Sequence, residues 1–549
     1  MFFQRMRAAG LILLAAASAG FAQPHTTVID KSPGASIAPV VPATAVRKWD
    51  RTVDLCIVGY GLAGASAAIE AADTDPKAKI LVLEKMPKAL AGGNSRASGQ
   101  TVLVPDQKDI EKFKTYIRAC NEPNPIPEEW LSVWARDMVD QLPWIQSVVE
   151  PVGYEIGYVG GGPLRWVKVT EFEELPGSDF NATSAHIREK GKGFEPAGVW
   201  NGFEKAVAAR PVEVLYETPA VALVQDPLSK TIHGVVARSK DGILITIKAR
   251  KGVLLACGGF ENDPQMQKDF HGMEEVYTTG TPGNTGDGIR MLMAAGAQIW
   301  HMKNRTQSGG MWIGIKTPDY PSSFIRQMVM KSGSWIDIGK TGDRFYDEAR
   351  AYHRQHMKYY DAGNYTDVKH YRSLPSYMIF DETTRKAQPI ATVWLSWPIS
   401  VEGYAWSRDN VKEIEKGWIV KADSLDDLAR KIDMDPDILR RTVDTWNSAC
   451  DAGMDADWGR NPKTMARIES GPFYAVSLAP ALVATTGGGV RDPRSRVLDW
   501  ESNPIPRLYE AGELGSYVAN LYQNGVFLAE AILSGRAAAR DALALPNLK

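Results

Sequence analysis

Residues 54–64 read Asp-Leu-Cys-Ile-Val-Gly-Tyr-Gly-Leu-Ala-Gly, and Glu84 follows 20 positions after the last of these glycines. The stretch begins as an apolar run and opens into the pattern Gly-x-Gly-x-x-Gly. An alanine-rich segment comes next, and a second apolar run over residues 80–83 ends directly before the acid. This order of strand, turn, helix, strand and acid is typical of a dinucleotide-binding site, whereas the glycine pattern alone would indicate only a glycine-rich turn.

The three glycines and the acid have separate physical roles in such a site. Gly59 permits the tight turn, Gly61 leaves room for a pyrophosphate, and Gly64 lets the helix pack closely against the strand. The helix that begins at Leu62 and Ala63 presents its N–H groups and the positive end of its dipole to the phosphates. The acid can accept hydrogen bonds from ribose hydroxyls, and its charge would repel a 2′-phosphate.

The composition is that of a globular protein with more than one domain. The chain has 549 residues, which exceeds the size of one ordinary hydrophobic core. It contains 63 Lys+Arg and 65 Asp+Glu, and the net charge of -2 gives no electrostatic reason to expect a nucleic-acid partner. No apolar run of about 18 residues follows the N-terminal segment, so we expect no membrane span.

The N-terminus has the features of a secretory signal. Residues 1–22 combine two basic residues, Arg5 and Arg7, with an apolar segment and small residues before Gln23. We therefore expect a signal peptide and export to the periplasm; the alternative is a wrongly assigned start on a cytoplasmic protein. Residues 23–50 are rich in Pro, Ala and Thr, which predicts a flexible leader.

The cysteines predict neither disulfides nor a metal site. Four cysteines do not build a disulfide framework in a chain of 549 residues. Cys56 and Cys257 fall within predicted strands, where a thiol behaves as a small apolar residue. No group of His and Cys residues has the spacing of metal ligands, so we expect no bound metal.

Four segments downstream predict regular elements of the nucleotide-binding domain. Residues 126–150 have the periodicity of a helix. Residues 212–224 and 232–247 alternate like antiparallel strands, and Asp241-Gly242 is typical of a hairpin turn. A buried strand over residues 251–257 then ends in two glycines.

The motifs and the local composition divide the rest of the chain into three parts. Residues 51–300 carry the glycine-ended strands and finish with a helix near Asp287, which could simply cap that helix. Residues 301–470 are rich in Trp and Tyr, contain no second dinucleotide pattern and predict a cap domain. Strand and glycine patterns return over residues 471–549. We therefore expect one nucleotide-binding domain, split by an inserted cap domain.

The glycine motifs occur in an order that is specific as a set. After the first motif and the acid come Gly-Gly-Asn-Ser at 92–95, Ala-Cys-Gly-Gly-Phe at 256–260, Thr-Gly-Asp-Gly at 285–288, Thr-Gly-Gly-Gly at 486–489 and Ala-Gly-Glu at 511–513. Over most of the chain this set resembles the FAD-dependent fumarate reductase/succinate dehydrogenase flavoprotein superfamily, which also contains the 3-ketosteroid dehydrogenases. The resemblance implies an α/β fold, with a Rossmann-like FAD-binding domain split by an inserted α+β cap domain for the substrate.

The resemblance also implies which residues hold FAD. The first glycine turn and Glu84 would hold the ADP half, Glu513 the ribityl chain, and the helix after Asn524 the flavin O2. No histidine lies between Gly93 and Ser98, near where succinate dehydrogenases attach their flavin, so we expect FAD without a covalent bond. The residues expected to contact FAD are Gly59, Gly61, Leu62, Ala63, Gly64, Glu84, Lys85, Gly92, Gly93, Asn94, Ser95, Ser98, Gly99, Gly258, Asp287, Glu513, Asn524 and Val526.

Three positions depart from the pattern of the fumarate reductases. Their substrate-binding His falls here near Val483 and Ala484. Their substrate-binding Arg falls on Tyr522, and their proton-donating Arg falls on Tyr352. A dicarboxylate brought into a partly desolvated site needs paired cations. We therefore do not expect fumarate to be the substrate.

The same positions resemble the 3-ketosteroid dehydrogenases, which carry Tyr at the places of Tyr352 and Tyr522 and Gly at that of Gly525. By this resemblance Tyr352 would move a proton, and Tyr522 with Gly525 would hold the ketone oxygen while FAD exchanges a hydride with the adjacent carbon. Each tyrosine could instead be an amphipathic residue at a domain edge, and Arg350 is the alternative proton carrier.

These residues predict an FAD-dependent oxidoreductase that acts on a CH–CH or C=C bond next to a carbonyl. The leading substrate is an apolar ring ketone such as a 3-ketosteroid, and a separate electron acceptor or donor is needed. One alternative is a periplasmic enoate or aryl-acrylate reductase of the fumarate reductase type. Another is a non-catalytic flavin protein that relays electrons.

Overall fold

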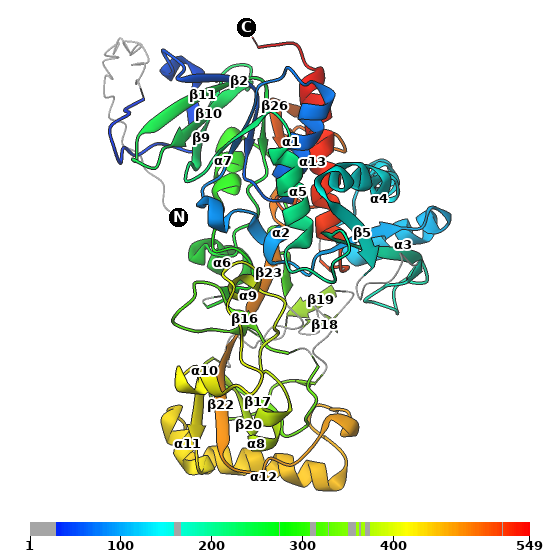
Figure 1. Cartoon of the computed structure of the whole chain (residues 1–549), viewed down its shortest axis with the longest axis vertical. Helices are drawn as coiled ribbons and strands as arrows, with labels where there is room; N and C mark the ends of the chain where they lie inside the picture. The colour runs from blue at the N-terminus through cyan, green and yellow to red at the C-terminus, as the bar shows by residue number, and fades with distance from the viewer. Residues whose placement is uncertain are drawn as a thin grey trace, which may run out of the picture.

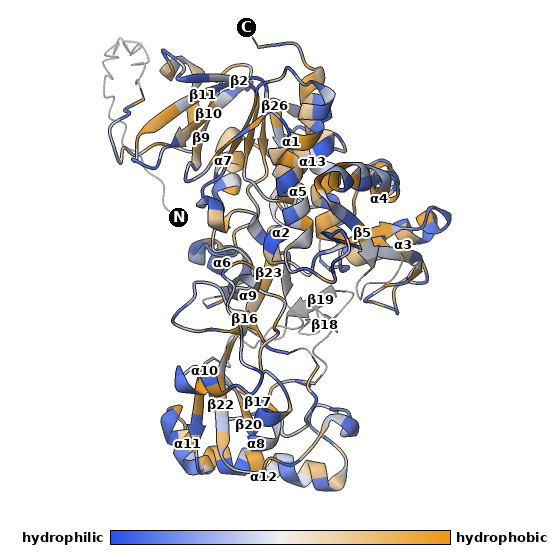
Figure 2. Cartoon of the chain, in the orientation of Figure 1, coloured by the Kyte–Doolittle hydropathy of each residue, from blue (hydrophilic) through white to orange (hydrophobic). Residues whose placement is uncertain are grey.

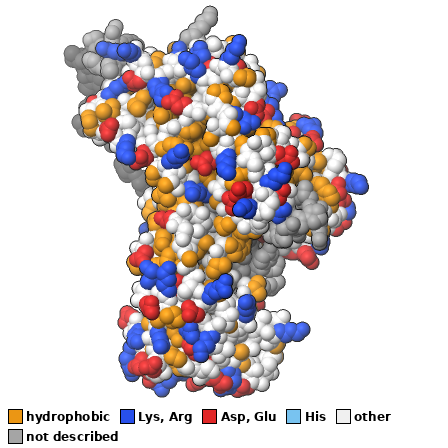
Figure 3. Space-filling view, in the orientation of Figure 1, with side chains coloured by type: hydrophobic (Ala, Val, Ile, Leu, Met, Phe, Trp, Pro, Cys, Tyr) orange, Lys and Arg blue, Asp and Glu red, His pale blue; other side chains and the backbone are white. Residues whose placement is uncertain are grey.

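The computed structural model describes residues 29–158, 166–273, 275–307, 314–327, 329–349, 358–361, 364–367, 374–518 and 520–548. The predicted signal peptide lies outside these residues. The molecule is elongated, with the domain that contains β2, β10 and β11 at one end and a second compact body at the other (Figure 1). Charged side chains of both signs are mixed over the face that Figure 3 shows.

A central sheet supports the first domain. Its strands lie in the order β1-β9-β10-β11-β2-β3-β8, and β26 pairs with both β11 and β25. The strands β11, β2, β3 and β8 run parallel to one another, whereas β9, β10 and β11 form an antiparallel meander. The bounds are β1 Val40–Pro42, β2 Arg51–Val58, β3 Ile80–Leu83, β8 Val212–Leu215, β9 Ala220–Gln225, β10 Ile232–Arg238, β11 Leu244–Leu255, β25 Arg496–Leu498 and β26 Pro504–Glu510.

The apolar run of β2 is buried on both faces of this sheet. Leu55 and Ile57 pack in one cluster with α1, α5 and α13, whereas Cys56 and Val58 pack in a second cluster with α7. Neighbouring residues of a strand point to opposite faces, so a strand without polar positions must be covered on both sides. Figure 2 shows the apolar colour of these strands between the covering elements. The bounds are α1 Leu62–Thr74, α5 Gly198–Ala208, α7 Asp287–Ala295 and α13 Val526–Ala544.

Strand pairing corrects two sequence predictions. Residues 212–224 form two strands instead of one, because β8 joins β3 in parallel while β9 pairs antiparallel with β10. The sequence predicts strands at 232–247 and at 251–257, with a break between residues 247 and 251. The structure has no break there: β10 ends at Arg238, and β11 runs from Leu244 to Leu255. The turn at Asp241-Gly242 does connect β10 to β11.

The second half of the predicted flexible leader is structured, so that prediction is wrong there. Val41 is buried, and β1 runs parallel to β9. The Thr246 hydroxyl donates to the Asp50 carboxylate at 2.8 Å, and the Arg238 guanidinium donates to the carbonyl of Ala35 at 2.8 Å. A composition rich in Pro, Ala and Thr does not reveal this, because the partners lie 196 and 203 residues away in the sequence.

A smaller sheet with two helices extends the first domain beside α13. Strand β7 pairs with β4, β5 and β6. The predicted helix at residues 126–150 is confirmed as α4. The bounds are β4 Thr101–Pro105, α3 Ile110–Asn121, α4 Glu128–Val149, β5 Tyr154–Tyr158, β6 Val167–Lys168 and β7 Asn181–Glu189.

The second body is built on a separate six-stranded sheet with helices packed against it. Its strand β22 lies after residue 470 in the sequence and pairs with β20 and β21 of this second body. The division of the chain into domains at residue 470 stays a prediction. The bounds are β15 Gly314–Ile315, β16 Phe324–Ile325, β17 Trp335–Ile338, β20 Ser376–Asp381, α8 Glu382–Ala387, α10 Val411–Glu415, β21 Ile419–Ala422, α11 Leu425–Lys431, α12 Pro436–Ala452 and β22 Phe473–Ala479.

Short elements join the two bodies next to α2. The backbone N–H of Trp397, at the start of α9, donates to the carbonyl of Thr279 at 2.8 Å. The bounds are α2 Gly93–Ala97, α6 Pro264–His271, β12 Tyr277–Thr278, β13 Ile299–Trp300, β14 Arg305–Gln307, β18 Lys358–Asp361, β19 Asn364–Asp367, α9 Trp397–Ser400, β23 Ala481–Thr485 and β24 Gly488–Gly489. Within the described part of the chain, no helix has both the length and the apolar character needed to cross a membrane.

Candidate active site

A cleft of about 880 Å³ lies where β2, β3 and β11 end. Parallel strands present their carboxyl ends at one edge of a sheet, which is where α/β proteins bind their ligands. Of the residues predicted to contact a dinucleotide, the following line the cleft: Gly59, Gly61, Leu62, Ala63, Glu84, Lys85, Gly93, Asn94, Ser95, Gly258, Asp287 and Glu513. The others do not line it: Gly64, Gly92, Ser98, Gly99, Asn524 and Val526.

The first glycine turn has the tight geometry that its sequence predicts. Gly59 has a φ of +101°, and a Cβ there would lie 2.3 Å from the carbonyl oxygen of Ala256. A Cβ on Gly64 would lie 2.1 Å from the carbonyl oxygen of Gly59, so α1 packs directly against the turn. Gly61 differs from both, because the nearest atoms to a Cβ there are 3.7 Å away. The space beside Gly61 therefore belongs to the cleft.

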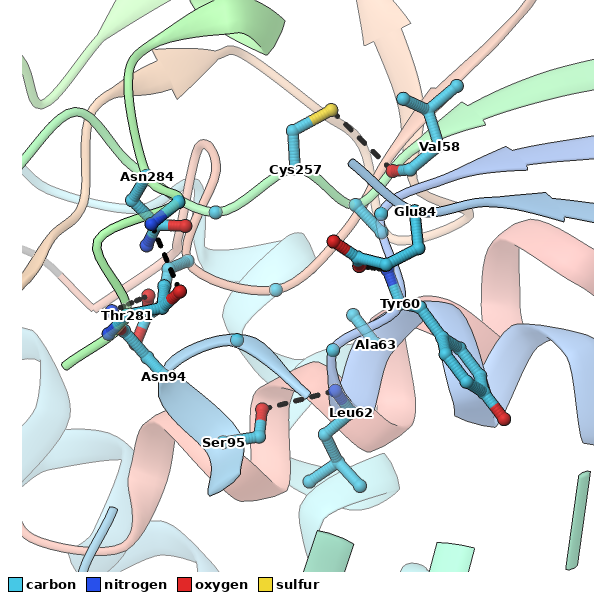
Figure 4. Close-up of a pocket in the computed structure, with 18 of the residues that line it drawn as sticks. Val58, Tyr60, Leu62, Ala63, Glu84, Asn94, Ser95, Cys257, Thr281 and Asn284 are labelled. Carbon is cyan, nitrogen blue, oxygen red and sulfur yellow. Dashed lines mark hydrogen bonds between the residues drawn. The ribbon is translucent and has the colours of Figure 1, made fainter. Parts of the chain in front are cut away.

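Glu84 lies beside the first glycine turn and lines the cleft. Its carboxylate accepts the backbone N–H of Tyr60 at 2.9 Å and that of Met86 at 2.7 Å. Burial raises the pKa of Glu84, against these hydrogen bonds, which lower it. The two N–H bonds hold the carboxylate in place at the edge of the cleft, which Glu84 lines (Figure 4).

The Gly-Gly-Asn-Ser motif forms the start of α2 and faces the turn across the cleft. The Ser95 hydroxyl accepts the backbone N–H of Leu62 at 3.1 Å, and the Asn94 side-chain oxygen accepts the backbone N–H of Thr281 at 3.0 Å. Figure 4 shows both contacts on the side of the cleft away from Glu84. The motif thus connects the first turn to the loop before α7.

Gln100 fixes the end of this motif and was not singled out from the sequence. It is fully buried and has a φ of +57°. Its side-chain amide donates to the carbonyls of Ser95 at 2.9 Å and Ser98 at 3.0 Å, and it accepts the backbone N–H of Val199 at 2.9 Å. A buried amide bound on three sides holds the turn in one conformation. A lone Gln after Gly99 carries no sequence signal for this role.

Asp287 is held by Lys85 and does not cap α7. The Lys85 ammonium contacts the Asp287 carboxylate at 2.8 Å and the Thr285 hydroxyl at 2.7 Å. Gly286 occupies the N-cap position, and no side chain caps the helix. The pair lines the cleft on the side of Glu84, so it brings one cation and one anion to the predicted ADP end.

The last predicted segment forms the N-terminus of α13. Gly525 caps this helix with a φ of +84°, and its carbonyl accepts the backbone N–H of Leu103 at 3.1 Å. The N–H of Gly525 donates to the Tyr522 hydroxyl at 3.0 Å. Tyr522 is 8% exposed, packs on Phe527 and does not line the cleft, whereas Phe527 and Leu528 of the first helical turn do.

The predicted proton carriers Tyr352 and Arg350 lie outside the described residues. The segment that leads to them is anchored by buried charges. The Glu348 carboxylate is fully buried and pairs with Arg344 at 2.8 Å and with Arg460 at 3.0 Å. Buried charges persist only when they are paired, so these contacts fix the chain at Glu348.

Apolar residues occupy the place where the resemblance puts a substrate histidine. The carbonyl of Val483 accepts the Asn94 side-chain amide at 3.0 Å, which puts this strand beside the cleft, and Ala484 is buried. His301 is nearby in the fold, but its Nδ1 bonds the carbonyl of Ser516 at 2.8 Å. Burial lowers the pKa of His301 to about 4, so its ring is neutral.

The cleft fits an extended dinucleotide. Gly61 and Gly93 face each other, since a Cβ on Gly93 would lie 3.8 Å from the Cα of Gly61, and neither carries a side chain into the space between them. The first turn of α1 offers N–H groups and a positive dipole end there, which suits a pyrophosphate. Glu84 offers acceptors for a ribose. Among the described residues, no group of His, Cys, Asp and Glu could hold a metal ion.

The fold and the cleft define a dinucleotide-binding flavoprotein with an inserted second body. The chain matches the family described as "FAD binding domain" over residues 54–525, and it belongs to that family. Together with its relatives, this makes it an FAD-dependent oxidoreductase that acts on CH–CH groups. The predicted cofactor and fold class are thereby confirmed.

Similar proteins span nearly the whole chain. Digoxin reductase of Eggerthella lenta is 27% identical over 90% of this chain and 88% of its own. Vinyl phenol reductase of Lactiplantibacillus plantarum is 26% identical over 89% of this chain and 96% of its own. The crystal structure of 3-ketosteroid Δ1-dehydrogenase from Sterolibacterium denitrificans superimposes with a TM-score of 0.69 at 20% identity, and it covers 90% of this chain and all of that one.

Proposed function

We propose that the protein exchanges a hydride between FAD and a carbon–carbon bond conjugated with the carbonyl of an apolar, ring-containing substrate. The observation that carries this proposal is the lack of charge at two positions. By the resemblance, Tyr522 stands where the dicarboxylate reductases place an Arg, and Val483 and Ala484 stand where they place a His. A ketone needs a neutral hydrogen-bond donor and an apolar surround, which these residues supply. The leading substrates are 3-ketosteroids and related ring enones.

A second candidate is the reduction of an enoate or aryl acrylate, and one specific observation favours the reductive direction. Both curated relatives described above carry the name of a reductase, and each matches about nine-tenths of this chain. In that direction a separate donor would supply the electrons. The active site would then discriminate substrates by the group conjugated with the double bond.

The chain's own residues would orient the substrate and move the proton. Bound FAD supplies hydride transfer at the flavin. Tyr522 would hold the carbonyl oxygen: its hydroxyl oxygen accepts the N–H of Gly525, and such a bond strengthens the hydroxyl as a donor. Tyr352 would carry the proton to or from the carbon next to the carbonyl. The N-terminus of α13 would stabilise negative charge on the reduced cofactor.

An anaerobic screen in both directions tests the proposal. Oxidised enzyme is mixed with saturated 3-ketosteroids, and photoreduced enzyme with 4-ene-3-ketosteroids, cinnamate-type acids and fumarate. We expect the flavin to bleach or recover its yellow colour with the ring ketones or enones and not with fumarate. An enzyme whose flavin responds to fumarate alone contradicts the proposal. A flavin that responds to none of these compounds supports the electron-relay alternative.

A further inference from the structure

Two carboxyl groups meet on one amide next to the cleft. The Asn94 side-chain nitrogen lies 3.1 Å from Glu261 Oε1 and 2.9 Å from Glu513 Oε2. It also lies 3.0 Å from the carbonyl of Val483. Glu261 is 2% exposed, whereas Glu513 lines the cleft. The three side chains come from the loop after β11, the loop after β26 and α2, so the fold itself brings them together.

Glu513 has too few hydrogen-bond donors to carry a full negative charge beside a charged Glu261. An amide nitrogen carries two hydrogens, yet it faces three acceptors here. Glu261 has further donors, since the backbone N–H of Thr485 reaches its Oε1 at 3.0 Å and the Asn284 side chain also lowers its pKa. Among the described residues, Glu513 has only the shared Asn94 amide. Neither carboxylate forms an ion pair within the described part of the chain. A buried charge without a partner is costly, so one carboxyl must retain a proton.

The pKa values of the two groups shift in the direction that this geometry requires. Burial raises the pKa of Glu261 to about 7, against the backbone hydrogen bonds that lower it. Burial and then the charge of Glu261 raise the pKa of Glu513 well above its ordinary value. Two carboxyls that interact this closely titrate as one unit.

The other charges that face this pair are already compensated. Glu530 of α13 raises the pKa of Glu513 further, but it is itself paired with Arg491 in a buried ion pair at 2.5 Å. Lys85 lines the same cleft and is occupied by Asp287 at 2.8 Å. The pair of carboxyls therefore responds mainly to new charge that appears in the cleft.

We propose that Glu261 and Glu513, bridged by Asn94, share one proton and take up a second when bound FAD receives two electrons. Negative charge in the cleft makes the remaining carboxylate harder to keep ionised, so a proton from solvent binds to it. When the electrons leave, the pair returns that proton. An external two-electron reductant supplies the electrons, and solvent supplies two protons, one for the reduced cofactor and one for the pair of carboxyls, so the step balances. This role uses the FAD site but not the proposed substrate, and it applies to either direction of the reaction.

Proton uptake by the holoenzyme tests the proposal directly. The bound FAD is reduced anaerobically by light in weak buffer at pH 8, and an indicator dye reports the protons taken up per FAD. Free FAD in the same assay supplies the count due to the flavin. We expect about one additional proton in the parent protein and about none in Glu261→Gln, because burial keeps the one remaining carboxyl, Glu513, protonated before reduction and no carboxylate is left to take up a second proton. An equal count in the parent and in Glu261→Gln overturns the proposal.

Two controls separate this effect from a general disturbance. Glu413→Gln alters a fully buried carboxyl in the second body, bonded to Tyr404 at 2.9 Å, and it should retain the parent count. Loss of the additional proton in this variant as well would overturn the assignment to Glu261 and Glu513. If Glu261→Gln fails to hold FAD, the parent alone decides: its additional proton should disappear as the pH rises from 8 to about 10, and a parent without one at pH 8 overturns the proposal. No outcome depends on substrate, so the proposed function can fail separately.

Discussion

Substitution of Gly61 should remove FAD binding and leave the apoprotein folded. A Cβ at Gly61 would lie 3.7 Å from the Gly92 carbonyl and the Ser95 hydroxyl, which is ordinary contact. The backbone φ of -89° at Gly61 suits any residue. Strain therefore arises only when a pyrophosphate occupies the cleft.

The magnitude follows from the crowding of a packed contact. Inserting carbon atoms into such a contact costs about 1–3 kcal/mol, and each 1.4 kcal/mol is tenfold in affinity. We expect Gly61→Ala to weaken FAD binding roughly 10- to 100-fold and Gly61→Val to abolish measurable binding. Glu84→Ala should weaken FAD binding less than Gly61→Val, because it removes hydrogen bonds to a ribose and places no new atoms in the cleft. Quenching of FAD fluorescence on titration with apoprotein measures each affinity.

Gly59→Ala is the matched control for this prediction. A Cβ there would lie 2.3 Å from the carbonyl oxygen of Ala256 at a φ of +101°, so this variant should lower the unfolding temperature of the apoprotein itself. Gly61→Val should instead unfold at the parent temperature. Parent-like FAD affinity in Gly61→Val, or a loss of stability equal to that of Gly59→Ala, would refute the placement of the pyrophosphate beside Gly61.

Three further predictions follow from the site. Acid precipitation should release all the FAD, since the segment around Gly93 carries no histidine to attach it; yellow colour retained on the pellet would contradict this. Fumarate should not reoxidise reduced viologen dye at a useful rate in the presence of the enzyme, because Tyr522 replaces the arginine that a dicarboxylate needs. Rapid reoxidation would contradict this prediction. Tyr352→Phe should lower turnover by roughly 10²–10⁴ and remove an ionisation from the pH profile, whereas Tyr522→Phe should lower the plateau and keep the profile's shape. Parent-like turnover of Tyr352→Phe would make Arg350 the next candidate.

The local part of the site could be predicted because its signals are contiguous. The turn, α1, β3 and Glu84 lie within about 30 consecutive residues, and each glycine has a steric reason that the sequence pattern already expresses. The helix of residues 126–150 was equally accessible, since an amphipathic period is a property of one segment. Both predictions required no knowledge of distant partners.

The remaining features depend on contacts between segments far apart in the chain. The side-by-side position of β8 and β3 brings together residues separated by about 130 positions, and alternation within a strand says nothing about its partner. Glu261 follows the Gly-Gly-Phe motif and carries no signal until Asn94 and Glu513 are seen on either side of it. Gln100 acts through the carbonyls of a turn, which any sequence could present.

Stopped-flow absorbance of the flavin under anaerobic conditions tests the central claim most directly. Photoreduced holoenzyme is mixed with a 4-ene-3-ketosteroid, and oxidised holoenzyme with the corresponding saturated ketone. If the protein exchanges a hydride between FAD and the bond next to a ring carbonyl, at least one mixture should change the flavin spectrum within a single turnover, with product formed in equal amount to FAD. A spectrum that stays constant in both mixtures, in a protein that binds FAD and responds to dithionite, would contradict the claim.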